Sequence, residues 1–138
     1  MTISAFVLAG ALCISIALIE AWLLVALLAT SGGALHRLLP NRTDLVRSHI
    51  DYLMMSLFLF VFYGLCRVTG AAPAGWLIAA ACLGAFFNPF AFLVHAMRPD
   101  FKEAPPPVFF TLLISSCLAT TIGFAATAWM VTARVLLQ

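Results

Sequence analysis

Four long runs of apolar residues, nearly free of charge, limit what this sequence can fold into. They cover about residues 3–35, 50–66, 68–94 and 104–133, with Glu20 inside the first run and Asp51 near the start of the second. Each run can supply roughly 18–27 helical residues, enough to cross a hydrocarbon core about 30 Å thick. Since backbone groups in lipid must be satisfied within each helix, the runs predict four transmembrane helices.

Composition supports the same class of protein. Hydrophobic residues make up 64% of the 138 residues and charged residues 9%, whereas a soluble domain carries about 25% charged residues. We therefore predict an all-α, integral membrane four-helix bundle, a single transmembrane domain over 1–138. Its helices are expected at about 4–33, 45–66, 74–97 and 107–134. The first run lacks a basic start and is too long for a cleaved signal peptide, so we expect a permanent helix.

The distribution of basic residues predicts the orientation. Five of the seven lie in the loops after the first and third helices: Arg37, Arg42, Arg47, Arg98 and Lys102. Arg67 and Arg134 lie on the other side, so the five-residue side is expected to be cytoplasmic and both termini non-cytoplasmic. We expect a multi-pass protein in the lipid bilayer of a bacterial inner membrane. The net charge of +2 indicates no nucleic-acid partner.

Glu20 is the acidic residue inside the first run. Counted from the cytoplasmic end of a helix that reaches residue 33, it lies roughly 20 Å deep, near the midplane. A charged carboxylate is costly there and is by default a functional-site hypothesis. We expect Glu20 to be neutral and to bond to Tyr63, or to Thr120 or Thr121 of the fourth helix. The alternative is a neutral acid that only joins helices.

Asn88 precedes Pro89 in the third predicted helix. The proline cannot donate to the carbonyl of Ala85, so a kink is expected there. Asn88 beside the kink predicts either a small polar cavity or a hydrogen bond that holds neighbouring helices together. The sequence favours neither over the other.

The stretch "RSHIDYLMM", residues 47–55, places a histidine at the lip of the second helix. The 100° step per residue puts His49, Tyr52, Ser56 and Tyr63 on one stripe of that helix. All three histidines, with His36 and His95, fall on the predicted cytoplasmic side. His49 is therefore either a ligand or an ordinary polar residue at a helix start.

These residues resemble four-helix membrane proteins of the styrene oxide isomerase and hydroxylaminobenzene mutase type. The resemblance rests on Arg47-Ser48-His49 followed by Met54-Met55, and on "GAFFNPFAF", which offers Gly84, Phe86, Phe87 and Asn88. It covers most of the chain in length, helix count and loop plan.

The resemblance implies a haem b whose iron is bound by His49, with Arg47 also at the cofactor. It implies ferric iron acting as a Lewis acid on a small lipophilic substrate, and a homo-trimer. Asp51 matches an acidic residue of the mutase branch. Met55, Phe92 and Gly84 stand where the isomerases have asparagine, tyrosine and aspartate, so we expect a different substrate.

Two functions stay open. The first is an isomerase or mutase, whose candidate catalytic residues are Glu20, Asp51, Tyr52, Tyr63 and Asn88. The second is a non-catalytic membrane protein: an accessory subunit, an assembly factor or a small-solute carrier. The first predicts a cofactor or a closed polar pocket beneath His49. The second predicts a filled bundle in which Glu20 and Asn88 are used in helix contacts.

Overall fold

The fold is all-α, as predicted. The computed structural model describes residues 1–137, and over them it contains helices and no strand. The four long helices are α1 (Ser4–Ala29), α3 (Arg42–Thr69), α4 (Gly75–Met97) and α5 (Pro107–Leu136), joined by the short helices α2 (Ala34–Leu38) and η1 (Pro99–Lys102). All four long helices are long and apolar enough to cross a membrane.

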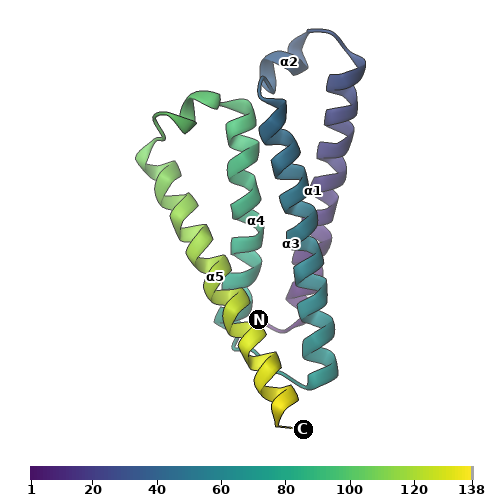
Figure 1. The fold of residues 1–138 in the computed structure, drawn as a ribbon, viewed down its shortest axis with the longest axis vertical. Helices are drawn as coiled ribbons and strands as arrows, with labels where there is room; N and C mark the ends of the chain where they lie inside the picture. The colour runs from purple at the N-terminus through teal and green to yellow at the C-terminus, as the bar shows by residue number, and fades with distance from the viewer. Residues whose placement is uncertain (138) are drawn as a thin grey trace.

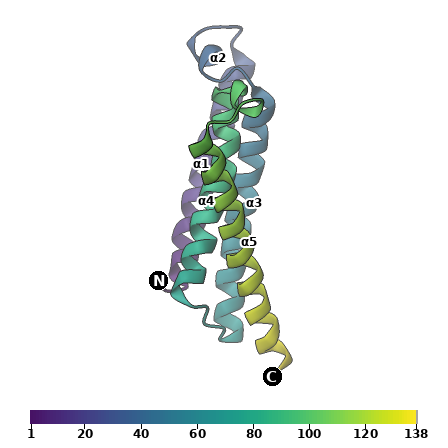
Figure 2. The same cartoon turned by 90° about the vertical axis from the view of Figure 1, so that its left-hand side faces the viewer.

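The two ends of the bundle differ. Both termini lie at one end, and α2 and η1 lie at the other (Figures 1 and 2). The end that carries α2 and η1 is therefore the one with the five clustered basic residues. That this end faces the cytoplasm stays a prediction.

Three helix boundaries differ by three or more residues from those expected: the end of α1, the start of α3, and the end of α3, which reaches Thr69 instead of residue 66. α1 ends at Ala29 instead of near residue 33, because Thr30 is already extended, with φ −116° and ψ 144°. Gly32 and Gly33 follow with φ angles of 87° and 106°, also outside the helical region. The segment then turns back as α2. α3 begins at Arg42, three residues earlier than expected, because the Asn41 side chain caps it by accepting a bond from the Asp44 N–H at 3.3 Å.

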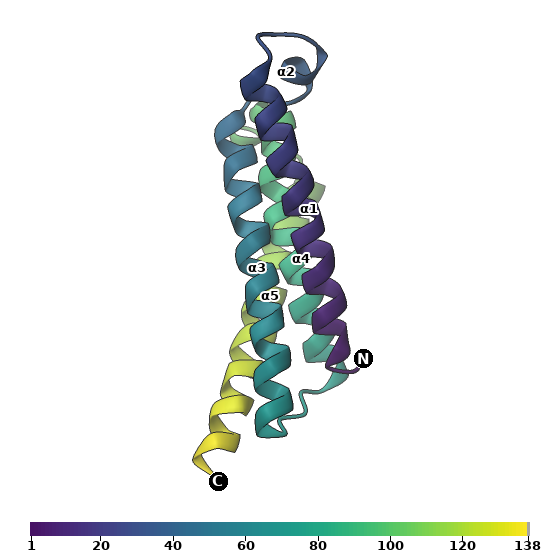
Figure 3. The same ribbon diagram turned by 90° about the vertical axis from the view of Figure 1, so that its right-hand side faces the viewer.

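Three helices form the core and the fourth lies at its edge. α1 and α3 run antiparallel side by side, and α4 packs against both (Figure 3). Phe6, Tyr52, Leu59, Ile78 and Ala85 are buried between them. α5 contacts mainly α4. The long apolar faces of α1 and α5 are left for lipid.

Small residues join α5 to α4. A Cβ added to Gly84 would lie 2.5 Å from the backbone nitrogen of Thr120, and a Cβ added to Gly123 would lie 2.5 Å from that of Ala81. The backbones can approach this closely only because both positions are glycine, as at other membrane helix interfaces. Beyond Gly84, towards η1, α4 and α5 diverge (Figure 1).

Gly84→Ala and Gly123→Ala should each lower the free energy of unfolding in detergent by about 1–2 kcal/mol, because the added methyl group collides with backbone. Gly64→Ala is the matched control, since nothing lies within 4 Å of its added Cβ. Unfolding by SDS titration measures all three. Equal midpoints for Gly84→Ala and Gly64→Ala would contradict the close packing.

Exposed tryptophans mark two levels along the bundle. Trp22 is 74% exposed, Trp76 64% and Trp129 73%. Trp76 lies at the terminal end of the bundle, where Gly75 is next to Met1. From the start of α1 to Trp22 is about 27 Å of helix, close to the thickness of a hydrocarbon core with tryptophans at its two boundaries. On this spacing Glu20, two residues before Trp22, would lie closer to one boundary than to the midplane; its predicted midplane position stays a prediction.

Candidate functional site

A buried polar cluster joins three helices below the α2 end of the bundle. Glu20 of α1 is 2% exposed, and Ser48 of α3 is fully buried. The Ser48 hydroxyl lies 2.6 Å from Glu20 Oε1 and 3.2 Å from the Pro89 carbonyl oxygen of α4. Within the described residues, Glu20 Oε2 has no hydrogen-bond partner. Ser48 thus connects α1 to the backbone of α4.

Two further side chains bond to α4 next to Pro89. The Tyr52 hydroxyl donates to the Phe86 carbonyl at 3.1 Å, and the Cys13 thiol lies 3.9 Å from the Ala85 carbonyl. Pro89 has no N–H for Ala85, so that carbonyl is free of its usual helical partner. The Cys13 thiol of α1 contacts that carbonyl, and Tyr52 and Ser48 of α3 add bonds to the neighbouring Phe86 and Pro89 carbonyls. They hold α4 in register with the other two helices.

The polar groups of this cluster are used in contacts between helices. The hollows along the α4–α5 side of the bundle and near Trp129 are not lined by Glu20, Ser48 or Tyr52. Asn88 points to the α5 side, where its Oδ1 accepts from the Cys117 thiol at 3.2 Å. Of the two alternatives at Asn88 and Pro89, the structure favours the hydrogen bonds between helices.

His49 is half-buried beside the cluster and has a defined orientation. Its Nδ1 lies 2.9 Å from the Ala17 carbonyl oxygen of α1. A carbonyl can only accept, so Nδ1 carries the hydrogen. In a neutral imidazole, Nε2 then presents its lone pair. Histidines that bind metals are commonly held in this way by a backbone carbonyl on the other ring nitrogen.

Asp44 organises the basic end of the bundle. It is fully buried, and its carboxylate lies 2.5 Å from Lys102 Nζ of η1 and 3.3 Å from Arg47 Nη1. The ion pair with Lys102 fastens the loop before α5 to the start of α3. Arg47, predicted to lie at a cofactor, is exposed and pairs with Asp44 in this structure.

The predicted partners of Glu20 are wrong. The Thr120 and Thr121 hydroxyls donate to carbonyls of their own helix at 2.8 Å. Tyr63 lies near the opposite end of α1, since the neighbouring Phe62 ring is 6.3 Å from that of Phe6. That level is about 21 Å of helix away from Glu20. Glu20 pairs with Ser48 instead.

The predicted catalytic residues therefore do not gather at one place. Glu20 and Tyr52 belong to the cluster around Pro89, and Asn88 faces α5. Asp51 is half-buried on α3, outside the cluster. Tyr63 lies far along the helix.

Ser48 is the residue that sequence reasoning missed. The spacing of residues in α3 could have identified it. Four residues that are buried in the structure recur every four positions: Asp44, Ser48, Tyr52 and Ser56. Such a row lies along one side of a helix. The stripe predicted for α3 included Tyr52 and Ser56 of this row, but it began at His49 instead of Ser48.

No protein-family model, curated protein or solved structure matches the chain. Among the described residues, no three histidine, cysteine or acidic side chains are grouped to hold a metal ion.

Proposed function

We propose that this protein is a small integral membrane protein that binds haem b through His49 and catalyses an isomerase or mutase reaction on a small lipophilic substrate. The observation that carries the proposal is the hydrogen bond from His49 Nδ1 to the Ala17 carbonyl, which leaves Nε2 as a ligand atom. The resemblance around Arg47-Ser48-His49 also supports His49 as the haem ligand.

The residues of the chain fit this role in two respects. His49 is fixed by α1 and stands on α3, so both helices set the ring orientation that a metal ligand requires. It lies on long apolar helices, from which a lipophilic substrate can approach within the bilayer. When bound, the haem would supply a Lewis-acidic ferric iron. The interior polar cluster would then hold the helices that carry His49, and not contact substrate.

A second candidate is a non-catalytic membrane protein, such as an accessory or assembly subunit. The observation that favours it is the polar cluster around Pro89, in which the Ser48, Tyr52 and Cys13 side chains contact α4 carbonyls. Such bonding is sufficient to explain why polar residues are kept inside an apolar bundle. In this case His49 serves only to join α3 to α1.

The absorption spectrum of the purified protein separates the two. Expression with a haem precursor, followed by purification in mild detergent, should give a Soret band with about one haem per chain if the first proposal holds. Absence of the band, both as purified and after incubation with haemin, would reject haem binding and leave the non-catalytic role.

A further inference from the structure

A groove runs between α4 and α5 from the middle of the bundle to its basic end. Three hollows follow one another along it, and neighbouring hollows share lining residues. The hollow near Gly84 shares Phe87 and Leu112 with the middle hollow, and the middle hollow shares Phe109 and Leu113 with the one near Lys102. We call this the α4–α5 groove and define it by Gly84, Phe87, Ala91, Leu112, Leu113 and Lys102. It extends for about 16 Å along α4, from Gly84 to His95.

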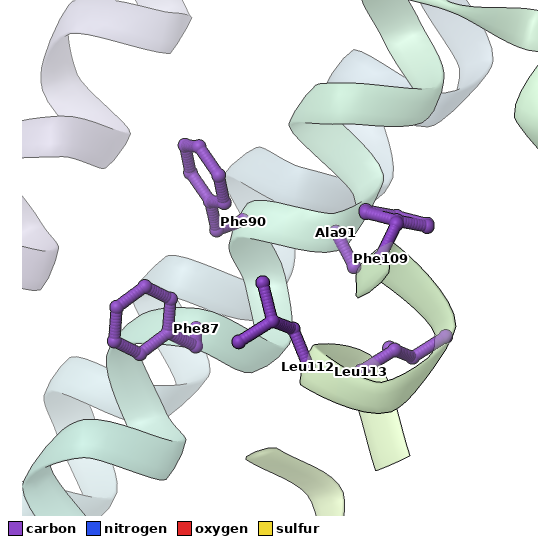
Figure 4. Close-up of a pocket in the computed structure, with 6 residues that line it drawn as sticks. All are labelled: Phe87, Phe90, Ala91, Phe109, Leu112 and Leu113. Atoms are coloured by element: carbon purple, nitrogen blue, oxygen red, sulfur yellow. The ribbon is translucent and has the colours of Figure 1, made fainter. Parts of the chain in front are cut away.

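The groove has one closed end and one open end. It closes where Gly84 meets Thr120, because there is no space for even a Cβ at that point. Its middle is apolar, and Figure 4 shows the side chains of α4 and α5 that line it. Its open end is lined by His95 and Lys102 next to the proline segment that begins α5. An apolar channel with a cationic mouth suits an amphiphile.

We propose that the α4–α5 groove binds one phospholipid of the surrounding bilayer, with an acyl chain along Phe87, Ala91 and Leu112 and its phosphate at Lys102. This proposal is independent of the haem proposal. The groove faces the lipid side of two membrane-spanning helices, so its occupant comes from the bilayer. Its length and narrowness match a single hydrocarbon chain.

The width of the groove argues against a helix of a second copy. The middle hollow is the narrowest of the three, with about 60 Å³ against about 200 Å³ and 250 Å³ in the hollows on either side. A helix with its side chains is about 10 Å across and cannot enter such a constriction. A methylene chain can pass through it to the wider hollow of about 200 Å³ near Gly84 and Ser116.

Charge at the open end favours a phosphate. Lys102 is paired with Asp44, but its side chain is still 39% exposed. Asp44 has a second cation in Arg47 at 3.3 Å. A lipid phosphate can therefore share Lys102 without leaving the buried carboxylate unpaired. Attraction between basic side chains and lipid headgroups adds to the burial of the chain.

Lipid retention in native mass spectrometry tests the site. The parent protein, extracted from phosphatidylglycerol-containing membranes, should retain one phospholipid. Ala91→Leu fills the middle of the groove and should lose it, whereas Leu118→Phe, a change on an exposed face of α5, should retain it. Lys102→Gln should lower retention about fivefold. Equal retention by the parent and Ala91→Leu, or none by the parent, would overturn the proposal.

Photo-cross-linking provides a second measurement, which does not require the groove to be filled by a larger side chain. Leu112 and Leu118 are both 57% exposed on α5, but only Leu112 lines the groove. A benzoylphenylalanine at 112 should still capture phospholipid after extensive detergent washing, and one at 118 should not. Capture of a second copy of the chain from 112 would assign the groove to an oligomer interface and reject the lipid.

Discussion

His49→Ala should abolish the Soret band of the purified protein while the protein stays in the membrane. In the proposed site the imidazole is the iron ligand, and alanine leaves no atom that can replace Nε2. His49 is half-buried at the edge of α3, so its removal costs one hydrogen bond to Ala17 and little packing. The loss of haem should therefore greatly exceed any loss of folded protein, which SDS titration would measure.

The other two histidines are internal controls for this experiment. His36 Nε2 lies 2.8 Å from Arg42, and the His95 ring packs edge-on against Phe109. His36→Ala and His95→Ala should retain haem at the parental level. A Soret band of equal intensity in all three variants would reject His49 as the ligand, even if the parent binds haem.

The long elements were predictable from sequence, because uncharged apolar runs of sufficient length leave the backbone no other way to satisfy its hydrogen bonds in lipid. The ends of the elements were less predictable. The glycine pair at 32 and 33 predicted the end of a helix, but not that α1 ends four residues before the expected position 33. The segment after the glycines forms α2, Ala34–Leu38, which no periodicity indicated.

The early end of α1 places Glu20 closer to the helix end than the roughly 20 Å expected. Counted from Ala29, Glu20 lies about 14 Å from the helix end, and Ser48 lies about 9 Å from the start of α3 at Arg42. The two residues therefore meet near the basic end. Tyr63, at the opposite end, cannot reach them. The sequence identified Glu20 as a buried polar residue, but its partner depends on how α1 and α3 are shifted along each other. An error of a few residues at a helix end changes that predicted shift, and with it the predicted pairing.

Ser48→Ala should lower the free energy of unfolding by about 3 kcal/mol, the upper part of the range for leaving a buried polar group unpaired. Glu20 is almost fully buried, and Ser48 is its hydrogen-bond partner in the structure. Without the serine, the whole carboxyl group is buried without a partner. Glu20→Leu should cost much less, because Ser48 keeps its bond to the Pro89 carbonyl and leucine suits an apolar core.

The double variant Glu20→Leu with Ser48→Ala gives the sharper result. Replacing both members of a buried polar pair by apolar residues is often nearly neutral. The double variant should therefore be more stable than Ser48→Ala alone, with a coupling free energy of about 2 kcal/mol. Simple additivity of the two single changes in SDS titrations would show that Glu20 and Ser48 do not interact.

Glu20→Gln tests the protonation state that this geometry favours. Ser48 carries one hydroxyl hydrogen, yet its oxygen lies within bonding distance of both Glu20 Oε1 and the Pro89 carbonyl. Both contacts are full hydrogen bonds only if a neutral Glu20 donates to Ser48 and Ser48 donates to Pro89. A glutamine amide can donate in the same way, so Glu20→Gln should fold like the parent. The infrared carboxylic-acid band of the parent should disappear in this variant. If Glu20→Gln also keeps full function while Glu20→Leu prevents assembly, the carboxyl group joins helices and takes no part in chemistry.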